Sequence, residues 1–149
     1  MTRRSKRLLL GILALAILFV AGKLGLTTDF NAQSAITSLI RVTPYEVTVV
    51  DGDTLRYRRE SVRLIGFDTP ETVFPQCRRE KDLGDRATEL LRALLTAAST
   101  IDLAFEANRD RYDRRLARVY INGEDLADLM IEAGLARAYD GGRRQSWCG

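Results

Sequence analysis

The sequence predicts an α+β fold, mainly β: a five-stranded OB-fold Greek-key barrel with two packed helices, preceded by one N-terminal transmembrane or signal helix. Three observations support this fold class. Residues 8–22 are apolar or small without interruption, and from residue 45 onward apolar side chains alternate in short runs. Two longer segments repeat apolar residues every three or four positions. The resulting order of three strands, a helix, two strands and a second helix is that of an OB-fold barrel.

Five segments are predicted as strands. In each of them β-branched or aromatic residues stand together or alternate with polar ones, as in half-buried strands. The Asn-Gly pair that follows the last segment is a turn signal. The predicted strands are 47–50, 54–58, 62–67, 101–105 and 116–121.

Two segments, about 80–97 and 126–133, are predicted as amphipathic helices. Gly134 stands where a glycine ends a helix favourably. The last residues, 141–149, are predicted to be irregular. The apolar stripe of the first helix consists of Leu83, Ala87, Leu90, Leu91, Leu94 and Leu95, and that of the second of Leu126, Leu129, Met130 and Ala133.

Residues 1–26 are predicted to be a signal anchor or a signal peptide, because a basic cluster at residues 3–7 precedes the apolar run. Cleavage near residue 22 or 34, an uncleaved anchor and a buried core helix are the alternatives, and we favour the anchor. Residues 27–43 are expected to be a tether, and 44–149 the folded domain. Both export interpretations place that domain outside the cytoplasm, held at the cell membrane or secreted after cleavage.

The composition excludes many hydrolytic chemistries. The 149 residues include 23 Lys+Arg, 20 Asp+Glu, two cysteines and no histidine. Without histidine there is no Ser-His-Asp triad and no HExxH zinc site. Two cysteines cannot build a Cys-rich zinc or iron–sulfur site, so any metal is expected to be a hard ion bound by oxygen. The net charge of +3 comes from the N-terminal cluster, so nucleic-acid binding requires local clustering of cations.

Three short segments concentrate charge. The plain structural interpretation is a hairpin turn for the first segment (51–54), a surface ion pair beside a proline turn for the second (63–71), and a solvated loop for the third (110–115). Carboxylates and an arginine at one strand end also suit a cation site facing a phosphate, and arginine is the better residue for a two-pronged phosphate contact. The segments are 51–54 (Asp-Gly-Asp-Thr), 63–71 (Arg-Leu-Ile-Gly-Phe-Asp-Thr-Pro-Glu) and 110–115 (Asp-Arg-Tyr-Asp-Arg-Arg).

Together with Glu-Ala-Gly-Leu-Ala at 132–136, these segments resemble the staphylococcal nuclease-like (thermonuclease) family over about residues 45–139. The resemblance implies a calcium-dependent nuclease that hydrolyses the phosphodiester bonds of DNA and RNA. It implies that Asp53, Asp68 and the carbonyl of Thr69 bind Ca²⁺. We expect the protein to be a monomer. Two alternatives remain. One is an OB-fold module that binds single-stranded nucleic acid or protein without catalysis, and the other is a structural barrel tethered to the membrane.

The resemblance also implies the roles of individual residues. Glu71 matches the family's general base, which activates or positions a water molecule. Arg63 and Arg114 match the two arginines that hold the phosphate and neutralise the transition state. Tyr112 matches a tyrosine near the terminal phosphate, and Arg111 a basic position beside it.

The sequence departs from the family pattern in two places. Asp113 stands where the family has a glycine, and an ion pair from it is expected to restrain Arg114. The chain ends in Gly-Gly-Arg-Arg-Gln-Ser-Trp-Cys-Gly, where the type enzyme continues into a third helix. In an oxidising compartment we expect Cys77 and Cys148 to pair and tether this tail, with about 4 kcal/mol of stabilisation; two unpaired thiols are the alternative.

Two aromatic residues near this end have more than one interpretation. For Tyr139, stacking against a base and plain packing remain open. Trp147 is expected to pack in the core rather than to stack on a base.

Overall fold

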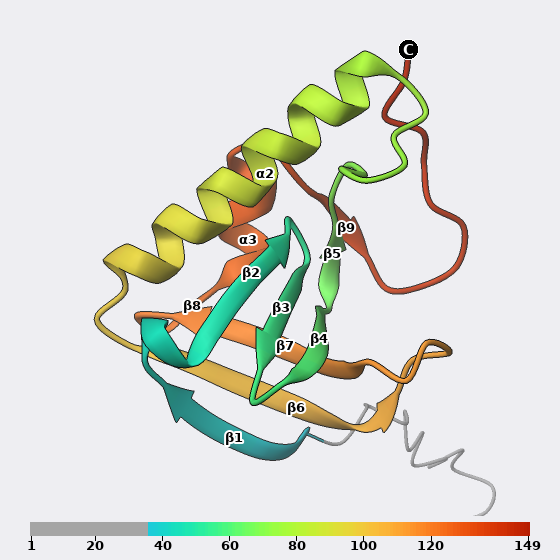
Figure 1. Cartoon of the computed structure of the whole chain (residues 1–149). Coiled ribbons are helices and arrows are strands. Elements are labelled where there is room, and N and C mark those ends of the chain that lie inside the picture. The colour runs from blue at the N-terminus through green and yellow to red at the C-terminus, as the bar shows by residue number, and fades with distance from the viewer. Residues whose placement is uncertain (1–35) are drawn as a thin grey trace, which may run out of the picture. The chain divides into compact units, whose positions relative to one another are not determined.

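The computed structural model describes residues 36–149 of the chain (Figure 1). The predicted export signal lies outside the described residues, as does the first part of the predicted tether. Among the described residues, neither helix has both the length and the apolar character needed to cross a membrane. The strands are β1 (Ile36–Val42), β2 (Val47–Asp51), β3 (Thr54–Tyr57), β4 (Glu60–Leu64), β5 (Gly66–Asp68), β6 (Ile101–Arg109), β7 (Arg115–Ile121), β8 (Glu124–Asp125) and β9 (Arg137–Tyr139).

The main sheet has the strand order β1-β6-β7-β4-β3-β2, with β8 pairing to β7. The β4–β7 pair is parallel, and the other pairs are antiparallel. Strands β1 and β2 form opposite edges of this sheet, yet only Thr43 and the 3-10 turn η1 (Pro44–Glu46) separate them. The chain therefore joins both edges and curls the sheet (Figure 1). With β1 and β2 counted as one bent strand, this is the five-strand order of an OB-fold.

Strand β1 corrects the predicted tether over residues 36–42, the strand that the structure shows there; residues 27–35 lie outside the described part. Its residues pair with β6, and Val42, opposite Ile101, is buried. A register shift between Ile36 and Ser38 interrupts the alternation, and Leu39 is exposed although it is apolar. Because the segment lacks a clean period of two, only its pairing with β6 reveals it as a strand.

The two predicted helices are present as α2 (Arg78–Ala97) and α3 (Leu126–Glu132). The Cys77 sulfur accepts a hydrogen bond from the Glu80 amide at the start of α2, and the Asp125 carboxylate caps α3 through the Ala127 amide. Gly134, with φ of 69°, ends α3 in the left-handed region. Figure 1 shows α2 lying along one side of the curved sheet. The core between sheet and helices contains Leu55, Tyr57, Val62, Leu64, Leu91, Ile101, Leu103, Phe105, Leu126 and Met130.

The predicted third strand, 62–67, is divided in two. Gly66 has φ of +99°, a conformation that L side chains rarely adopt, and the chain turns there out of the main sheet. Beyond this turn β5 pairs with β9 in a separate two-stranded sheet. The turn brings Asp68, at the end of β5, back beside Arg63 of β4.

Candidate active site

A pocket of about 1370 Å³ opens where the β2–β3 turn, the end of β4, the β6–β7 loop and the chain after β9 come together. An adjoining pocket of about 420 Å³ shares Thr69, Glu71 and Arg144 with it. Asp68 lines the adjoining pocket. The other predicted metal, catalytic and substrate-binding residues all line the main pocket: Asp53, Arg63, Thr69, Glu71, Arg111, Tyr112, Arg114 and Tyr139.

The Asp-Gly-Asp-Thr segment is a hairpin turn and also part of the pocket. A Cβ at Gly52 would lie 2.8 Å from Thr69 Oγ1 and 3.0 Å from the Ala87 Cβ, so glycine is needed here for close approach. The turn thereby packs against Thr69, whose hydroxyl donates to Asp53 Oδ2 at 3.1 Å. The Thr69 amide lies 3.4 Å from the same oxygen. Asp53 is thus buried and held in place by the segment after β5.

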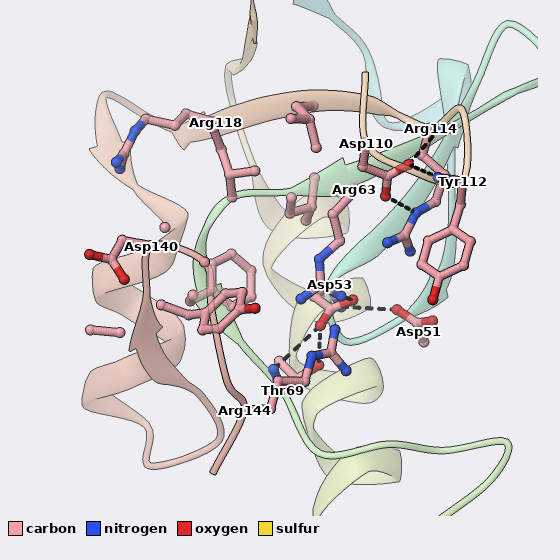
Figure 2. A pocket seen from close by; sticks show the side chains of 18 of the residues that line it. Asp51, Asp53, Arg63, Thr69, Asp110, Tyr112, Arg114, Arg118, Asp140 and Arg144 are labelled. Carbon is pink, nitrogen blue, oxygen red and sulfur yellow. Dashed lines mark hydrogen bonds and ion pairs between the residues drawn. The ribbon is translucent and has the colours of Figure 1, made fainter. Parts of the chain in front are cut away.

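Arg63 is a buried cation between two buried carboxylates. Its guanidinium forms ion pairs with Asp53 and with Asp68, the second at 3.2 Å between Nη2 and Oδ1. Burying an unpaired guanidinium would be costly, so these contacts explain how an arginine is tolerated inside β4. Figure 2 shows the Arg63 guanidinium beside Asp53 in the middle of the pocket.

Negative charge is crowded around this arginine. Burial and the nearby charge of Asp53 raise the pKa of Asp51. Burial and Asp53 also raise the pKa of Asp68, although Arg144 and Arg63 oppose the change. Neighbouring carboxylates whose ionised forms are disfavoured provide the all-oxygen donor set that a hard divalent cation prefers.

This donor set fits calcium in chemistry. The described residues contain no group of three or more His, Cys, Asp or Glu side chains already arranged to hold a metal ion. In the structure the two carboxylates proposed from the sequence as calcium ligands, Asp53 and Asp68, are instead paired with the Arg63 guanidinium.

Asp110 organises the β6–β7 loop. Its Oδ1 accepts hydrogen bonds from the amides of Tyr112 and Arg114, both at 2.9 Å, and its Oδ2 accepts one from Arg114 Nε at 2.7 Å. Burial raises the pKa of Asp110, but the hydrogen bonds from Arg114 and Tyr112 outweigh it and hold the pKa below its ordinary value. The exposed Tyr112 ring lies under the guanidiniums of Arg111 and Arg114. One carboxylate therefore aims Arg114 into the pocket.

The expectation that Asp113 pairs with Arg114 is wrong. Asp113 has φ of 61°, a left-handed conformation that explains why a glycine suits this position. Its carboxylate lies 3.7 Å from Arg109, and its carbonyl accepts a hydrogen bond from the same arginine at 2.7 Å. Asp113 therefore points away from Arg114, which Asp110 holds instead.

Glu71 lies on the loop between β5 and α2. Its Oε1 accepts hydrogen bonds from the amides of Thr72 and Val73 at 3.0 and 3.1 Å. The loop itself rests on α2 at Gly84, where a Cβ would lie 2.8 Å from the Pro70 carbonyl oxygen. Helix packing and local hydrogen bonds thus fix the carboxylate at the border of the two pockets.

The chain after β9 also contributes to the site. The Tyr139 hydroxyl donates to the Gly142 carbonyl at 2.8 Å, and Arg144 Nε lies 2.9 Å from Asp68 Oδ1. The Sγ atoms of Cys77 and Cys148 are 2.06 Å apart. Trp147 is buried, as its predicted packing role requires.

The sequence motifs included Asp51 and Asp110 without indicating a role for either, and Arg144 was not recognised as a site residue. The spacing of four between Asp110 and Arg114 is a usable signal, because a loop carboxylate commonly binds amides a few residues ahead. Asp51 stands two residues before Asp53, a predicted calcium ligand, in the Asp-Gly-Asp-Thr segment, so its position is also a usable signal. Nothing in the sequence around Arg144 indicates that its side chain reaches Asp68.

Strand order and pocket together define an OB-fold protein with carboxylates and arginines gathered at one end of its curved sheet. The family model described as "Staphylococcal nuclease homologue" matches residues 61–146, more than half of the chain. The chain belongs to the staphylococcal nuclease homologue family, which confirms the resemblance drawn from the motifs.

Relatives of the chain have informative names. It is 32% identical to a thermonuclease of Staphylococcus intermedius over 89% of this chain and 82% of the relative. It is 32% identical to a thermonuclease of Staphylococcus hyicus, covering 72% of this chain and 62% of the relative. With endonuclease YncB of Bacillus subtilis it shares 33% identity, over 59% of this chain and 44% of the relative. The matches to the last two thus span between two fifths and two thirds of those proteins.

Proposed function

We propose that this protein is a calcium-dependent nuclease that hydrolyses phosphodiester bonds in DNA and RNA. The observation that carries the proposal is the gathering of Arg63, Arg114, Glu71 and Asp53 around one pocket. The names of the relatives, thermonuclease and endonuclease, support the same activity.

The two arginines bind the scissile phosphate in this proposal. An in-line attack on phosphorus increases the negative charge on the equatorial oxygens, and guanidiniums already held in place stabilise that charge without reorganising. Arg63 is held by Asp53 and Asp68, and Arg114 by Asp110. Arg111 and Tyr112 then contact the substrate at the pocket mouth, and Tyr139 stacks against a base.

Glu71 is the proposed general base. Because Oε1 already accepts two backbone amides, Oε2 is available to accept a proton from water. The water oxygen forms a bond to phosphorus, the bond from phosphorus to the leaving oxygen breaks, and the water proton passes to Glu71. The leaving oxygen takes a proton from solvent, and Glu71 then releases its proton to solvent, so that one water is consumed and the carboxylate is restored.

Asp53, Asp68 and the carbonyl of Thr69 are the residues proposed to hold calcium. When bound there, the ion supplies positive charge that offsets the charge developing on the phosphoryl oxygens. The raised pKa values of Asp51 and Asp68 support a cation at this place, because an added positive charge favours both ionised carboxylates.

The proposal also includes export of the chain and a disulfide bond between Cys77 and Cys148. Residues 1–26 anchor the chain in the cell membrane, or are cleaved from it, so that the folded domain, β1 included, acts outside the cytoplasm as a monomer. In that oxidising compartment Cys77 and Cys148 form a disulfide, which their Cα separation of 6.0 Å permits. Thiol labelling of the unfolded protein with and without a reductant tests the disulfide, since only the reduced sample should gain two labels.

A digestion assay tests the activity. DNA and RNA are incubated with the wild type and Arg63→Ala in calcium, and in EGTA. We expect cleavage of both substrates by the wild type in calcium, loss of cleavage in EGTA, and a 10²- to 10³-fold lower rate for Arg63→Ala. Binding of single-stranded nucleic acid without any cleavage would instead indicate the non-catalytic module.

A further inference from the structure

Arg144 is a cation of the active-site pocket that the roles described above do not use. It lines both the main and the adjoining pocket. Its Nε lies 2.9 Å from Oδ1 of Asp68, whose side chain is only 7% exposed, while the Arg144 side chain is 44% exposed. The guanidinium thus rests on a buried carboxylate and keeps one side open to solvent.

The path of the C-terminal segment explains how Arg144 reaches this place. Gly141 and Gly142 have φ values of 111° and 91°, and this turn, which favours glycine, redirects the chain after β9. Beyond Arg144 the chain is fixed again, because Arg137 stacks on the buried Trp147 ring at 3.7 Å and donates to the Ser146 carbonyl at 3.0 Å. The Cys77–Cys148 contact lies just after these residues. Arg144 is therefore held between two fixed points.

The remaining donors of Arg144 suit a phosphate. The contact with Asp68 is made by Nε at 2.9 Å, and the half-exposed guanidinium presents further N–H donors. Arg63 already contacts Asp53 and Asp68, so Asp68 is shared by two arginines. A planar guanidinium with free donors at a half-exposed position binds a phosphate oxygen pair well.

The position of Arg144 indicates which phosphate it meets. In Figure 2 its guanidinium lies on the side of Asp53 and Thr69, away from Arg114 and Tyr112. The scissile phosphate must lie within reach of Arg63 and Arg114 together. A nucleic-acid strand that continues past Arg63 toward Thr69 then brings its next phosphate to Arg144.

We propose that Arg144 is a substrate-binding residue that contacts the phosphate next to the scissile one. This inference rests on the proposed nuclease function. It predicts that Arg144 contributes to the binding of oligonucleotides, that at saturating calcium its substitution leaves the chemical step unchanged, and that it is dispensable for a dinucleotide with a single phosphodiester.

The first experiment measures kinetics of the full-length wild type, Arg144→Gln, Arg144→Lys and Arg92→Gln. Arg92 lies on the exposed side of α2, so its substitution removes the same charge away from the pocket. On a single-stranded 12-mer we expect Arg144→Gln to raise KM about ten-fold with kcat within two-fold. Lysine should restore part of the loss, and Arg92→Gln should match the wild type. On a dinucleotide all four proteins should have the same KM.

The second experiment measures binding of the same 12-mer in a Glu71→Gln background over a range of salt concentrations. Loss of one phosphate contact should reduce the magnitude of the slope of log Kobs against log[salt] by about 0.7 in Arg144→Gln, and not in Arg92→Gln. The fluorescence of Trp147, the single tryptophan, should be unchanged, which shows that the segment remains packed.

The outcomes separate this inference from the proposed function. If the wild type cleaves the 12-mer while Arg144→Gln keeps the wild-type KM and salt slope, the role of Arg144 is overturned and the nuclease proposal stands. An equal rise in KM on the dinucleotide would also overturn it, because Arg144 would then act on the scissile phosphate. If the wild type neither binds nor cleaves, both proposals fail together.

Discussion

Asp110 holds Arg114 at two points, its backbone amide at 2.9 Å and its Nε at 2.7 Å. The arginine is therefore fixed in backbone and side chain by a single carboxylate four residues earlier in the same loop. An arginine fixed in this way loses little conformational freedom when a phosphate arrives, which favours binding of the transition state.

The first prediction concerns this pair. Arg114→Ala should lower kcat/KM on single-stranded DNA by 10²- to 10³-fold, because it removes one of the two fixed phosphate donors. Asp110→Ala should lower it by roughly ten-fold, since Arg114 remains but is no longer aimed. The double variant should be no slower than Arg114→Ala alone, because the carboxylate acts through the arginine. Additive losses in this double-mutant cycle would show that Asp110 has a separate role.

Arg115 provides a matched comparison with Arg114. Its guanidinium stacks over the buried Phe105 ring at 3.5 Å and lies 3.8 Å from Glu60, outside the residues that line the main pocket. Arg115→Ala should therefore keep kcat within about two-fold while lowering the free energy of unfolding by about 1 kcal/mol. Kinetics and urea unfolding of both alanine variants check this. A larger activity loss for Arg115→Ala than for Arg114→Ala would show that the assignment is shifted by one residue.

The Asp110 carboxylate should also make stability depend on pH. Its pKa is lower in the folded protein than the ordinary value of about 3.9, so its stabilising effect is present above that value and is lost as the pH falls through the folded pKa. Asp110→Asn should thus be less stable than the wild type at pH 7, with a difference that shrinks below about pH 4. Urea unfolding at pH 7, 5 and 3 measures it. A difference that stays constant over this range would contradict the role of the ionised carboxylate.

Gly84 links α2 to the loop that carries Glu71. An alanine Cβ there would lie 2.8 Å from the Pro70 carbonyl oxygen and from Thr72 Cγ2. Alanine improves helix propensity by about 1 kcal/mol, but the clash should outweigh this gain and lower the free energy of unfolding by about 1–2 kcal/mol. Because the loop must move, kcat should fall roughly ten-fold. The control is Ala93→Gly at an exposed position of α2, which should lower the free energy of unfolding and leave kcat unchanged. A kcat for Gly84→Ala equal to that of the wild type would contradict the link between α2 and the Glu71 loop.

The helices and most strands were predictable because the periodic spacing of their apolar residues is visible in the sequence. Both helices and all five predicted strands are present near the expected positions. Strand β1 was missed because a register shift breaks its alternation, and β9 because three residues are too few for a pattern. The break at Gly66 was also missed, since a single glycine in a strand does not reveal the pairing of β5 with β9.

The site was predictable where its residues stand within motifs and not where tertiary contacts bring them in. Asp53 and Glu71 follow recognisable strand ends, Arg63 lies within a recognisable strand, and the three converge as expected. Gly84 and Arg144 act through contacts with segments distant in the sequence, at the Pro70 loop and at Asp68. The partner of Arg114 was predicted wrongly because the left-handed turn at Asp113, which turns its carboxylate toward Arg109, has no signature in the residue order alone.

The role of Glu71 as general base is the central claim, and steady-state hydrolysis of single-stranded DNA by the wild type and Glu71→Gln in calcium tests it most directly. Glutamine keeps the shape and the amide contacts of Oε1 but cannot take the proton from water. We predict a kcat for Glu71→Gln that is 10²- to 10⁴-fold lower, with KM close to that of the wild type. A Glu71→Gln protein that cleaves at the wild-type rate would contradict this role.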